Sequence, residues 1–92
     1  MYYVYLIQSI SDPKRLYIGA TCDLKKRLNE HNNSRNTSTK GYVPWQVIYY
    51  EACINKFDAF RRERYLKTSQ GSRLLKRRLK EYFYQNKLIS TP

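Results

Sequence analysis

Five side chains able to take part in chemistry are spread along this 92-residue sequence: Tyr5, Tyr17, Arg27, His31 and Glu63. Hydrolysis of a phosphodiester needs a water nucleophile, a group that takes its proton, a cation that holds the phosphate and usually a metal ion. The two phenols, the guanidinium and the carboxylate match these roles in type. A phenol has a reference pKa of about 10, so a tyrosine base requires cations that lower its pKa. We expect the basic surroundings in this chain to do so.

Each of these residues also has an ordinary structural explanation. A strand tyrosine usually packs in the core, Arg27 can lie along an apolar surface with its charge in water, and His31 suits a helix C-terminus. Glu63 can form an i,i+4 pair with Lys67, worth roughly 0.3–0.5 kcal/mol. Alternatively, Glu63 lies in the basic segment FRRERYLK as a ligand for a divalent metal ion, with nucleic-acid phosphates supplying the remaining negative charge.

The charge of the chain favours an anionic partner. The sequence contains 18 Lys and Arg against 7 Asp and Glu, a formal net charge of +11. Residues 56–92 hold 11 of the basic and 3 of the acidic side chains, so the basic surface is mainly C-terminal. Nucleic acid is the first partner that such a field suits, and an anionic membrane the second.

No segment of the sequence reads as an export signal or a membrane span, because no apolar run approaches roughly 18 residues. Cys22 and Cys53 have no metal-ligand spacing, and we interpret both as reduced thiols. We therefore expect a cytoplasmic, nucleoid-associated protein without a membrane partner. The oligomeric state stays open.

The pattern of the chain predicts the order ββαβαα in a single domain, residues 1–92. Residues 2–8 and 15–20 are expected to form a hairpin, and residues 45–52 a third strand. Helices are expected from a cap at Thr21 or Asp23 to about residue 32, from 56 to about 68 after Asn55, and over about 72–87 after Ser72. The polar residues 32–44 read as a long loop. A three-stranded antiparallel sheet flanked by helices, an α+β fold, follows from this order.

Three finer expectations concern faces and register. Pairing hairpin residues whose numbers sum to 22 or 23 places Tyr5 opposite Tyr17 or one place from it. Strict alternation in the third strand places Trp45, Val47 and Tyr49 on one face. In the first helix, the i, i+3, i+4, i+7 spacing predicts two leucines that hold the helix on the sheet, with Arg27 and His31 facing a cleft lined by the tyrosines.

Four short motifs together carry a resemblance to a known family. The segments are YVY at 3–5, YIG at 17–19, KKRLNEH at 25–31 and FRRERYLK at 60–67. In order and spacing they resemble the GIY-YIG nuclease family over about residues 2–80, and in particular its short stand-alone bacterial members, the excinuclease C N-terminal nuclease domain and the Slx-type endonucleases. The first motif departs from the family pattern because it begins with a tyrosine, and the segment KTSQGSR offers no counterpart to an asparagine that many family members carry.

The resemblance implies a role for each of the five residues. Tyr5 corresponds to the tyrosine favoured as general base, and Tyr17 to one that assists water positioning or proton transfer; which of the two is the base stays open. Arg27 matches the arginine that steadies the phosphate, and His31 a position that contacts phosphate or moves a proton. Glu63 matches the ligand of a single Mg²⁺ or Mn²⁺. The implied activity is divalent-metal-dependent hydrolysis of DNA, structure-selective rather than sequence-selective, in repair or recombination.

The substrate expected from this reading is branched, flapped or otherwise distorted duplex DNA. Nine basic residues are expected to bind its backbone: Lys26, Lys40, Arg61, Arg64, Lys67, Arg73, Lys76, Arg77 and Lys80. A second hypothesis keeps the fold and the charge but not catalysis, which makes the chain a nucleic-acid-binding module whose binding is salt-sensitive and independent of Glu63. A third, a basic protein that docks on other proteins or ribosomal RNA, leaves the tyrosines and the glutamate unexplained.

Overall fold

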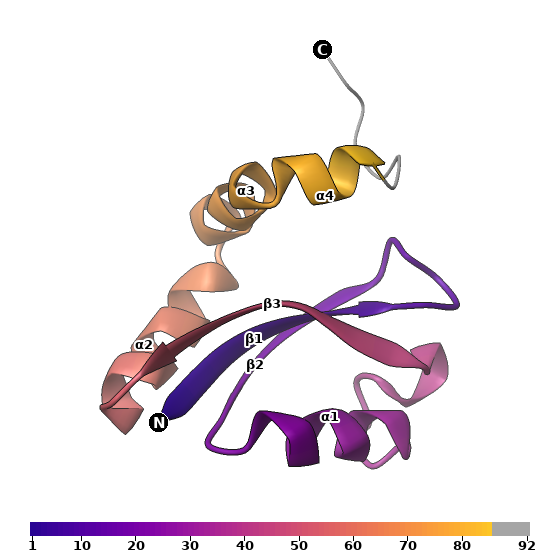
Figure 1. The fold of residues 1–92 in the computed structure, drawn as a ribbon, viewed down its shortest axis with the longest axis horizontal. Helices are drawn as coiled ribbons and strands as arrows, with labels where there is room; N and C mark the ends of the chain where they lie inside the picture. Colours follow the sequence, from indigo (N-terminus) through magenta and orange to yellow (C-terminus); the bar gives the residue numbers. More distant parts are fainter. Residues whose placement is uncertain (86–92) are drawn as a thin grey trace.

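The computed structural model describes residues 1–85, and they form a three-stranded antiparallel sheet with helices on both faces (Figure 1). The elements follow the order β1 (Tyr2–Ser9), β2 (Leu16–Thr21), α1 (Leu24–Asn32), the 3-10 helix η1 (Lys40–Tyr42), β3 (Trp45–Cys53), α2 (Lys56–Leu66), α3 (Ser69–Arg78) and α4 (Lys80–Gln85). The sheet order is β2-β1-β3, so β1 is central and β2 is an edge. The expected α+β fold is confirmed, with one more helix than predicted.

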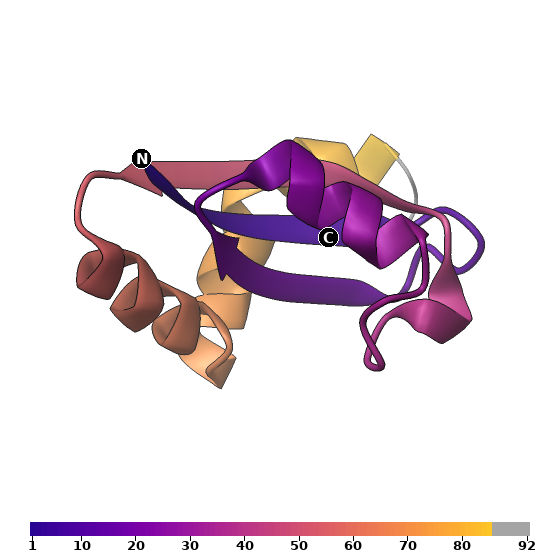
Figure 2. The ribbon, with the colours of Figure 1, turned by 90° about the horizontal axis from the view of Figure 1, so that it is seen from below.

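The helices divide between the two faces of the sheet. α1 lies against one face and α3 and α4 against the other, as the two perpendicular views show (Figure 1, Figure 2). α2 lies beside the end of β2 (Figure 2). Because β2 is an edge strand, side chains from α1 and from α2 can both reach it, each from its own side. No helix within the described residues has the length and apolar character needed to cross a bilayer.

The local signals for helix starts are mostly as predicted. The Asp23 side chain accepts a hydrogen bond from the Lys26 amide and caps α1, and the Asn55 side chain caps α2. The predicted start of the next helix after Ser72 is wrong: Thr68, not Ser72, caps α3, so residues 69–72 form the first turn of that helix. The predicted single helix over 72–87 is also divided, because α3 ends at Arg78 and α4 begins at Lys80. Residues 86–87 of that prediction lie outside the described part of the chain.

The hairpin register differs from the prediction. Tyr5 pairs with Gly19, and Tyr17 pairs with Ile7, so paired numbers sum to 24 rather than to 22 or 23. The two tyrosines are therefore diagonal neighbours on the same face of the sheet, two places apart. The turn of the hairpin is therefore centred on residue 12, and within it the Arg15 amide donates a hydrogen bond to the Asp12 carbonyl.

A β-bulge overturns the predicted alternation of β3. Leu6 pairs with Tyr49 but Ile7 pairs with Val47, which leaves Ile48 as an extra residue in β3. Val47 consequently packs with Tyr5 and Ile7 on the α1 side, as does Trp45, whereas Tyr49 packs on the opposite side. Trp45, Val47 and Tyr49 do not share one face.

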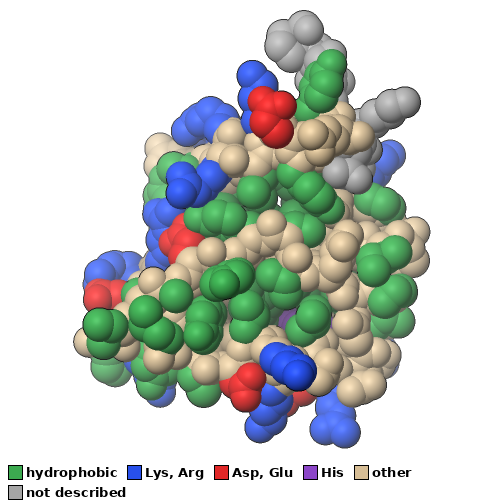
Figure 3. Space-filling view, in the orientation of Figure 1, with side chains coloured by type: hydrophobic (Ala, Val, Ile, Leu, Met, Phe, Trp, Pro, Cys, Tyr) green, Lys and Arg blue, Asp and Glu red, His purple; other side chains and the backbone are tan. Residues whose placement is uncertain are grey.

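Basic side chains cover much of the surface around this core. Figure 3 shows lysines and arginines over α2 and α3 and again around α1, with hydrophobic side chains between the two groups. The two cysteines are free thiols, and Cys22 is exposed.

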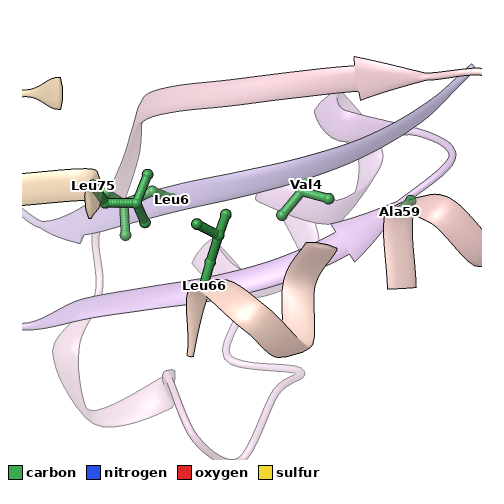
Figure 4. Packing of buried hydrophobic residues seen from close by; sticks show 5 residues of the cluster. All are labelled: Val4, Leu6, Ala59, Leu66 and Leu75. Carbon is green, nitrogen blue, oxygen red and sulfur yellow. The ribbon is translucent and has the colours of Figure 1, made fainter. Parts of the chain in front are cut away.

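Two buried clusters flank the sheet. On the side of α2 and α3, Val4, Leu6, Ala59, Leu66 and Leu75 form an entirely apolar cluster (Figure 4). On the side of α1, the buried hydrophobic members are Tyr5, Ile7 and Trp45. Strand β1 therefore contributes alternate residues to the two clusters, and Tyr5 is placed on the α1 side by the pleat of the strand.

Candidate functional site

Tyr5 and His31 meet in the interior on the α1 side of the sheet. The Tyr5 hydroxyl lies 2.8 Å from Nε2 of His31, and Nδ1 of His31 lies 2.8 Å from Oγ1 of Thr39. His31 and Thr39 are both completely buried, and Tyr5 is 2% exposed. The expectation that His31 faces a cleft at the edge of the α1 stripe is therefore wrong: it is the one buried residue of that helix. Loop 33–44 covers it, because Thr39 belongs to that loop.

The hydrogen bonds around His31 are all satisfied by one assignment of protons. Arg27 donates from Nε to the Tyr5 oxygen at 3.4 Å, so the phenol uses its own proton toward Nε2 of His31. The neutral imidazole then holds its proton on Nδ1 and donates it to Thr39. Thr39 in turn donates to the Asn36 carbonyl at 3.4 Å. This arrangement gives both imidazole nitrogens a hydrogen-bond partner, and the phenol proton points at an acceptor.

Arg27 is fixed beside the phenol by a second contact. Its Nη1 donates to Oε1 of Glu30 at 2.9 Å, one turn along α1. Both side chains are about one-third exposed, so the guanidinium joins the buried pair to the surface. The ion pair and the phenol together hold the cation where a phosphate oxygen can approach it from solvent.

The close fit of Tyr5 depends on a glycine in the neighbouring strand. A Cβ atom at Gly19 would overlap the Tyr5 hydroxyl and ring. Tyr5 and Gly19 are directly paired in the register, and the phenol lies across the space that a side chain would fill. The glycine of the YIG motif thus has a steric role, since it lets Tyr5 reach His31.

The two titratable groups of this pair are both held neutral. Burial raises the pKa of Tyr5, outweighing the hydrogen bond and the positive charge of Arg27, which act in the opposite direction. Arg27 thus acts in the expected direction, but burial has the larger influence, so the pKa of this phenol is raised and not lowered. Burial also lowers the pKa of His31, and the charge of Arg27 lowers it further. At neutral pH the pair is an uncharged phenol donating to an uncharged imidazole.

Tyr17 and Glu63 lie at the open side of this cluster, at the β2 edge. The Tyr17 ring contacts the His31 ring, with centroids 5.1 Å apart. Nζ of Lys67 lies 5.8 Å from the centroid of the Tyr17 ring and 3.1 Å from Oε2 of Glu63. The Glu63 charge is also among the influences that raise the pKa of Tyr5. Elements from both faces of the sheet therefore bring all five predicted residues to one region.

The donor set suits a metal ion only when substrate helps to bind it. No group of three or more His, Cys, Asp or Glu side chains gathers within residues 1–85. The side chain of Glu63 is 22% exposed, and its ion pair with Lys67 is the structural alternative considered above. Mg²⁺ is commonly held by one or two carboxylates together with waters and substrate phosphates. Glu63 is thus compatible with a metal shared between the chain and a bound phosphate.

The nine basic residues predicted to contact a DNA backbone are all exposed. Within the described residues, Lys67 is the one whose ammonium group contacts members of the site. Arg61 is engaged by Asp58 on the surface of α2, at 2.6 Å. The remaining seven are spread over α1, η1, α2, α3 and α4.

Sequence reasoning missed Thr39 and Glu30, which orient His31 and Arg27. Glu30 had a signal, since it follows Arg27 by three residues on a helix. Thr39 had none, because it is one of several Ser and Thr residues in a loop without periodicity. A second missed group joins β3 to α2: Arg62 donates to both Glu51 carboxylate oxygens, at 2.8 and 3.0 Å. This pair anchors the residue next to Glu63.

Comparison with known proteins gives relatives of two kinds. A UPF0213 protein of Clostridium perfringens is 38% identical over 68 residues, which cover 73% of this chain and 71% of that protein. A UPF0213 protein of Staphylococcus saprophyticus is 33% identical over 76 residues, 82% of this chain and 90% of that protein. The structure-specific endonuclease subunit SLX1 of Candida dubliniensis is 40% identical over 53 residues, 51% of this chain. This chain spans only 18% of that SLX1 subunit.

The chain also matches a known family over most of its length. Residues 1–76 match the GIY-YIG catalytic domain and include all five residues described above. A GIY-YIG catalytic domain points to nuclease activity on nucleic acid, as the sequence motifs implied. The chain belongs to the GIY-YIG catalytic domain family.

Proposed function

We propose that this chain is a divalent-metal-dependent endonuclease that hydrolyses DNA phosphodiester bonds and selects substrates by structure. The observation that carries the proposal is the hydrogen-bonded series Arg27, Tyr5, His31, in which a cation and a proton acceptor share one phenol. We place the activity in the cytoplasm, on nucleoid DNA undergoing repair or recombination. The family match and the similarity to a part of SLX1 support the class of reaction.

In this proposal Tyr5 is the group that takes the proton of the attacking water. As the phenol oxygen accepts that proton, its own proton passes to Nε2 of His31, so Tyr5 never has to exist as a free phenolate. Such a transfer suits a phenol whose pKa is raised, because a phenolate formed in advance would be costly in this buried position. The water oxygen bonds to phosphorus, the bond to the leaving oxygen breaks, and solvent protonates that oxygen.

The other three residues hold and stabilise the phosphate. Arg27 contacts a non-bridging oxygen, on which negative charge increases as the water attacks. Tyr17, at the open side of the cluster, positions the water. Glu63 holds Mg²⁺ or Mn²⁺, which when bound supplies Lewis-acid stabilisation of the phosphate oxygens. Lys67, which pairs with Glu63 at 3.1 Å, would contact the DNA backbone instead when Glu63 holds a metal ion.

The test is cleavage of branched, flapped and linear DNA with Mg²⁺, Mn²⁺ or EDTA. We expect cutting of the branched and flapped DNA that EDTA abolishes and that Glu63→Gln reduces by about 10²–10³-fold, similar to the loss of one charge-stabilising group at other active sites. Glu81→Gln is the matched control, because Glu81 is exposed on α4. Equal cutting by the two variants, or no metal-dependent cutting of any substrate, contradicts the proposal.

One observation favours the second hypothesis, a non-catalytic nucleic-acid-binding module. The Glu63 carboxylate already has a cation, Lys67 at 3.1 Å, and an inactive relative would have no need to release it. This hypothesis expects salt-sensitive DNA binding that Glu63→Gln leaves unchanged and that divalent metal does not strengthen. The same set of proteins and DNA molecules therefore separates the two functions when binding is measured beside cleavage.

A further inference from the structure

A pocket of about 280 Å³ opens beside the candidate site, between the sheet and the helices on its second face. We call it the α3 pocket. Its floor is apolar and includes Leu6, Leu66 and Leu75, which point toward one another in Figure 4. Its volume is just below the range of roughly 300–1,000 Å³ typical of small-molecule sites, so it suits a single ring system rather than an extended ligand.

The rest of the lining combines aromatic rings with positive charge. The aromatic lining residues are Tyr17 from β2 and Phe83 from α4, and the basic ones are Lys67 and Lys76. Ser72 adds a hydroxyl group to the lining. A flat heterocycle attached to an anion matches all three features, because aromatic side chains stack on bases of any sequence and lysines bind phosphates.

Two residues belong both to the α3 pocket and to the candidate site. Tyr17 lines the pocket while its ring contacts His31, and Lys67 lines the pocket while its ammonium contacts Glu63. A nucleotide in the pocket would therefore be next to the nucleotide whose phosphate lies against Arg27 and Glu63. The pocket and the reacting phosphate would share one strand.

We propose that the α3 pocket takes one unstacked base of the DNA strand adjacent to the reacting phosphate, with Lys76 binding the phosphate of that nucleotide. This inference rests on the proposed function and gives it a substrate class, DNA with an unpaired nucleotide at the site. Extruding a base costs a few kcal/mol in an intact duplex and much less at a bulge or a flap. The pocket thereby accounts for selection by structure in a chain that has little surface for reading base edges.

The experiment measures binding in EDTA, so that cleavage plays no part. The probe is a duplex with one bulged 2-aminopurine, compared with the same duplex in which 2-aminopurine is paired. We expect the bulged duplex to bind at least about fivefold more tightly, as one stacked base contributes roughly 1–3 kcal/mol. We also expect the fluorescence of the bulged base to fall on binding, because the base stacks against the pocket rings.

Two variants and their controls make the result specific. Ser72→Phe fills the pocket and should bring the preference for the bulge close to one, while Gln70→Phe, on the exposed side of α3, should keep it. Lys76→Met should weaken the bulged duplex more than the paired one, whereas Lys80→Met, outside the pocket, should weaken both equally. Circular dichroism verifies folding. If the Ser72 variant does not fold, the Lys76 variant still provides the test, because Lys76 is exposed and its replacement should not disturb the fold.

An unchanged preference in both Ser72→Phe and Lys76→Met overturns the pocket, as does a wild-type protein with no preference. These outcomes are distinguishable from failure of the proposed function. Metal-dependent cleavage without a preference for the bulged duplex leaves the nuclease proposal intact and contradicts the pocket proposal. A preference for the bulge that depends on Ser72, together with no cleavage in any metal ion, supports the pocket proposal and contradicts the nuclease proposal.

Discussion

The two faces of β1 show two ways of filling a protein interior. On one face, Val4 and Leu6 pack in an apolar cluster with side chains from α2 and α3. On the other, Tyr5 brings a hydroxyl into the interior, where His31 and Thr39 complete a hydrogen-bonded series. Among the described residues no buried side-chain donor or acceptor lacks a partner, so the polar face is as complete as the apolar one. The Tyr5–His31 pair of the candidate site is therefore part of the core, and the other three residues extend from it to the surface.

The largest expected difference comes from the neighbours Val4 and Tyr5. Tyr5→Phe should lower the rate of DNA cleavage by roughly 10²–10⁴-fold, the usual contribution of a group that transfers protons. It should also cost about 1–3 kcal/mol of unfolding free energy, because Nε2 of His31 loses its partner. Val4→Ala should cost a similar amount, about 2–3 kcal/mol, with the cleavage rate of the folded protein unchanged. Chemical denaturation measures the unfolding free energy and single-turnover cleavage measures the rate. Similar cleavage rates in the two variants would show that the two faces of β1 do not differ in function.

Two glycines sharpen the same comparison. Gly19→Ala places a methyl group against the Tyr5 ring, and a displaced phenol should lower cleavage about 10²-fold. Gly71→Ala places one against the Tyr65 carbonyl and Leu66, where α3 meets α2, and overpacking there should cost about 1–3 kcal/mol of stability. Thermal unfolding and cleavage rates for both variants are the measurements. Loss of activity in Gly71→Ala at temperatures where it is folded would show that the two faces are not separable.

The pH dependence of stability reports on His31. Its pKa in the folded protein lies below the reference value of about 6.5, so the unfolded chain binds more protons in this range. Unfolding free energy should therefore fall as the pH drops below about 6.5 and should be insensitive to His31 above it. The measurement is the unfolding free energy of wild type and His31→Gln at pH 7.5 and 5.5. An acid-induced loss as large in the variant as in wild type would assign the effect to other groups.

The smallest effect is expected at Thr39. Thr39→Val removes the acceptor of the Nδ1 proton and should cost about 1 kcal/mol of stability. It also frees the imidazole to change tautomer, so cleavage should slow, but less than in Tyr5→Phe. Thr37→Val is the control, because Thr37 is exposed in the same loop. Equal rates for the two variants would mean that Thr39 does not orient His31.

Local rules predicted the fold well where the signal was local. The caps at Asp23 and Asn55 and the antiparallel sheet follow from residue types and short spacings. The bulge at Ile48 and the hairpin register depend on how three strands fit together, so alternation and number sums alone misassigned Tyr49 and Tyr17. The break between α3 and α4 likewise depends on packing, because both helices bury residues, Leu75 and Phe83, against the same sheet.

The sequence predicted which residues come together in the candidate site, but not that two of them are buried. Motif spacing led to Tyr5 and His31, yet both were expected at a cleft with a lowered phenol pKa. The structure buries them together, because the Tyr5 hydroxyl pairs with a histidine inside the core and loop residue Thr39 closes over it. A pKa depends on the competition between desolvation and nearby charge, and the sequence contains only the charges.

We propose that Tyr5 and His31 act as one proton-transferring unit in metal-dependent DNA cleavage. The decisive experiment is a double-mutant cycle in which Tyr5→Phe, His31→Gln and the double variant are compared by single-turnover cleavage of flapped DNA in Mn²⁺. We expect the double variant to cleave no more slowly than the slower single variant, because either change alone interrupts the transfer. Rate losses that multiply in the double variant, or a wild-type protein without metal-dependent cleavage, would contradict it.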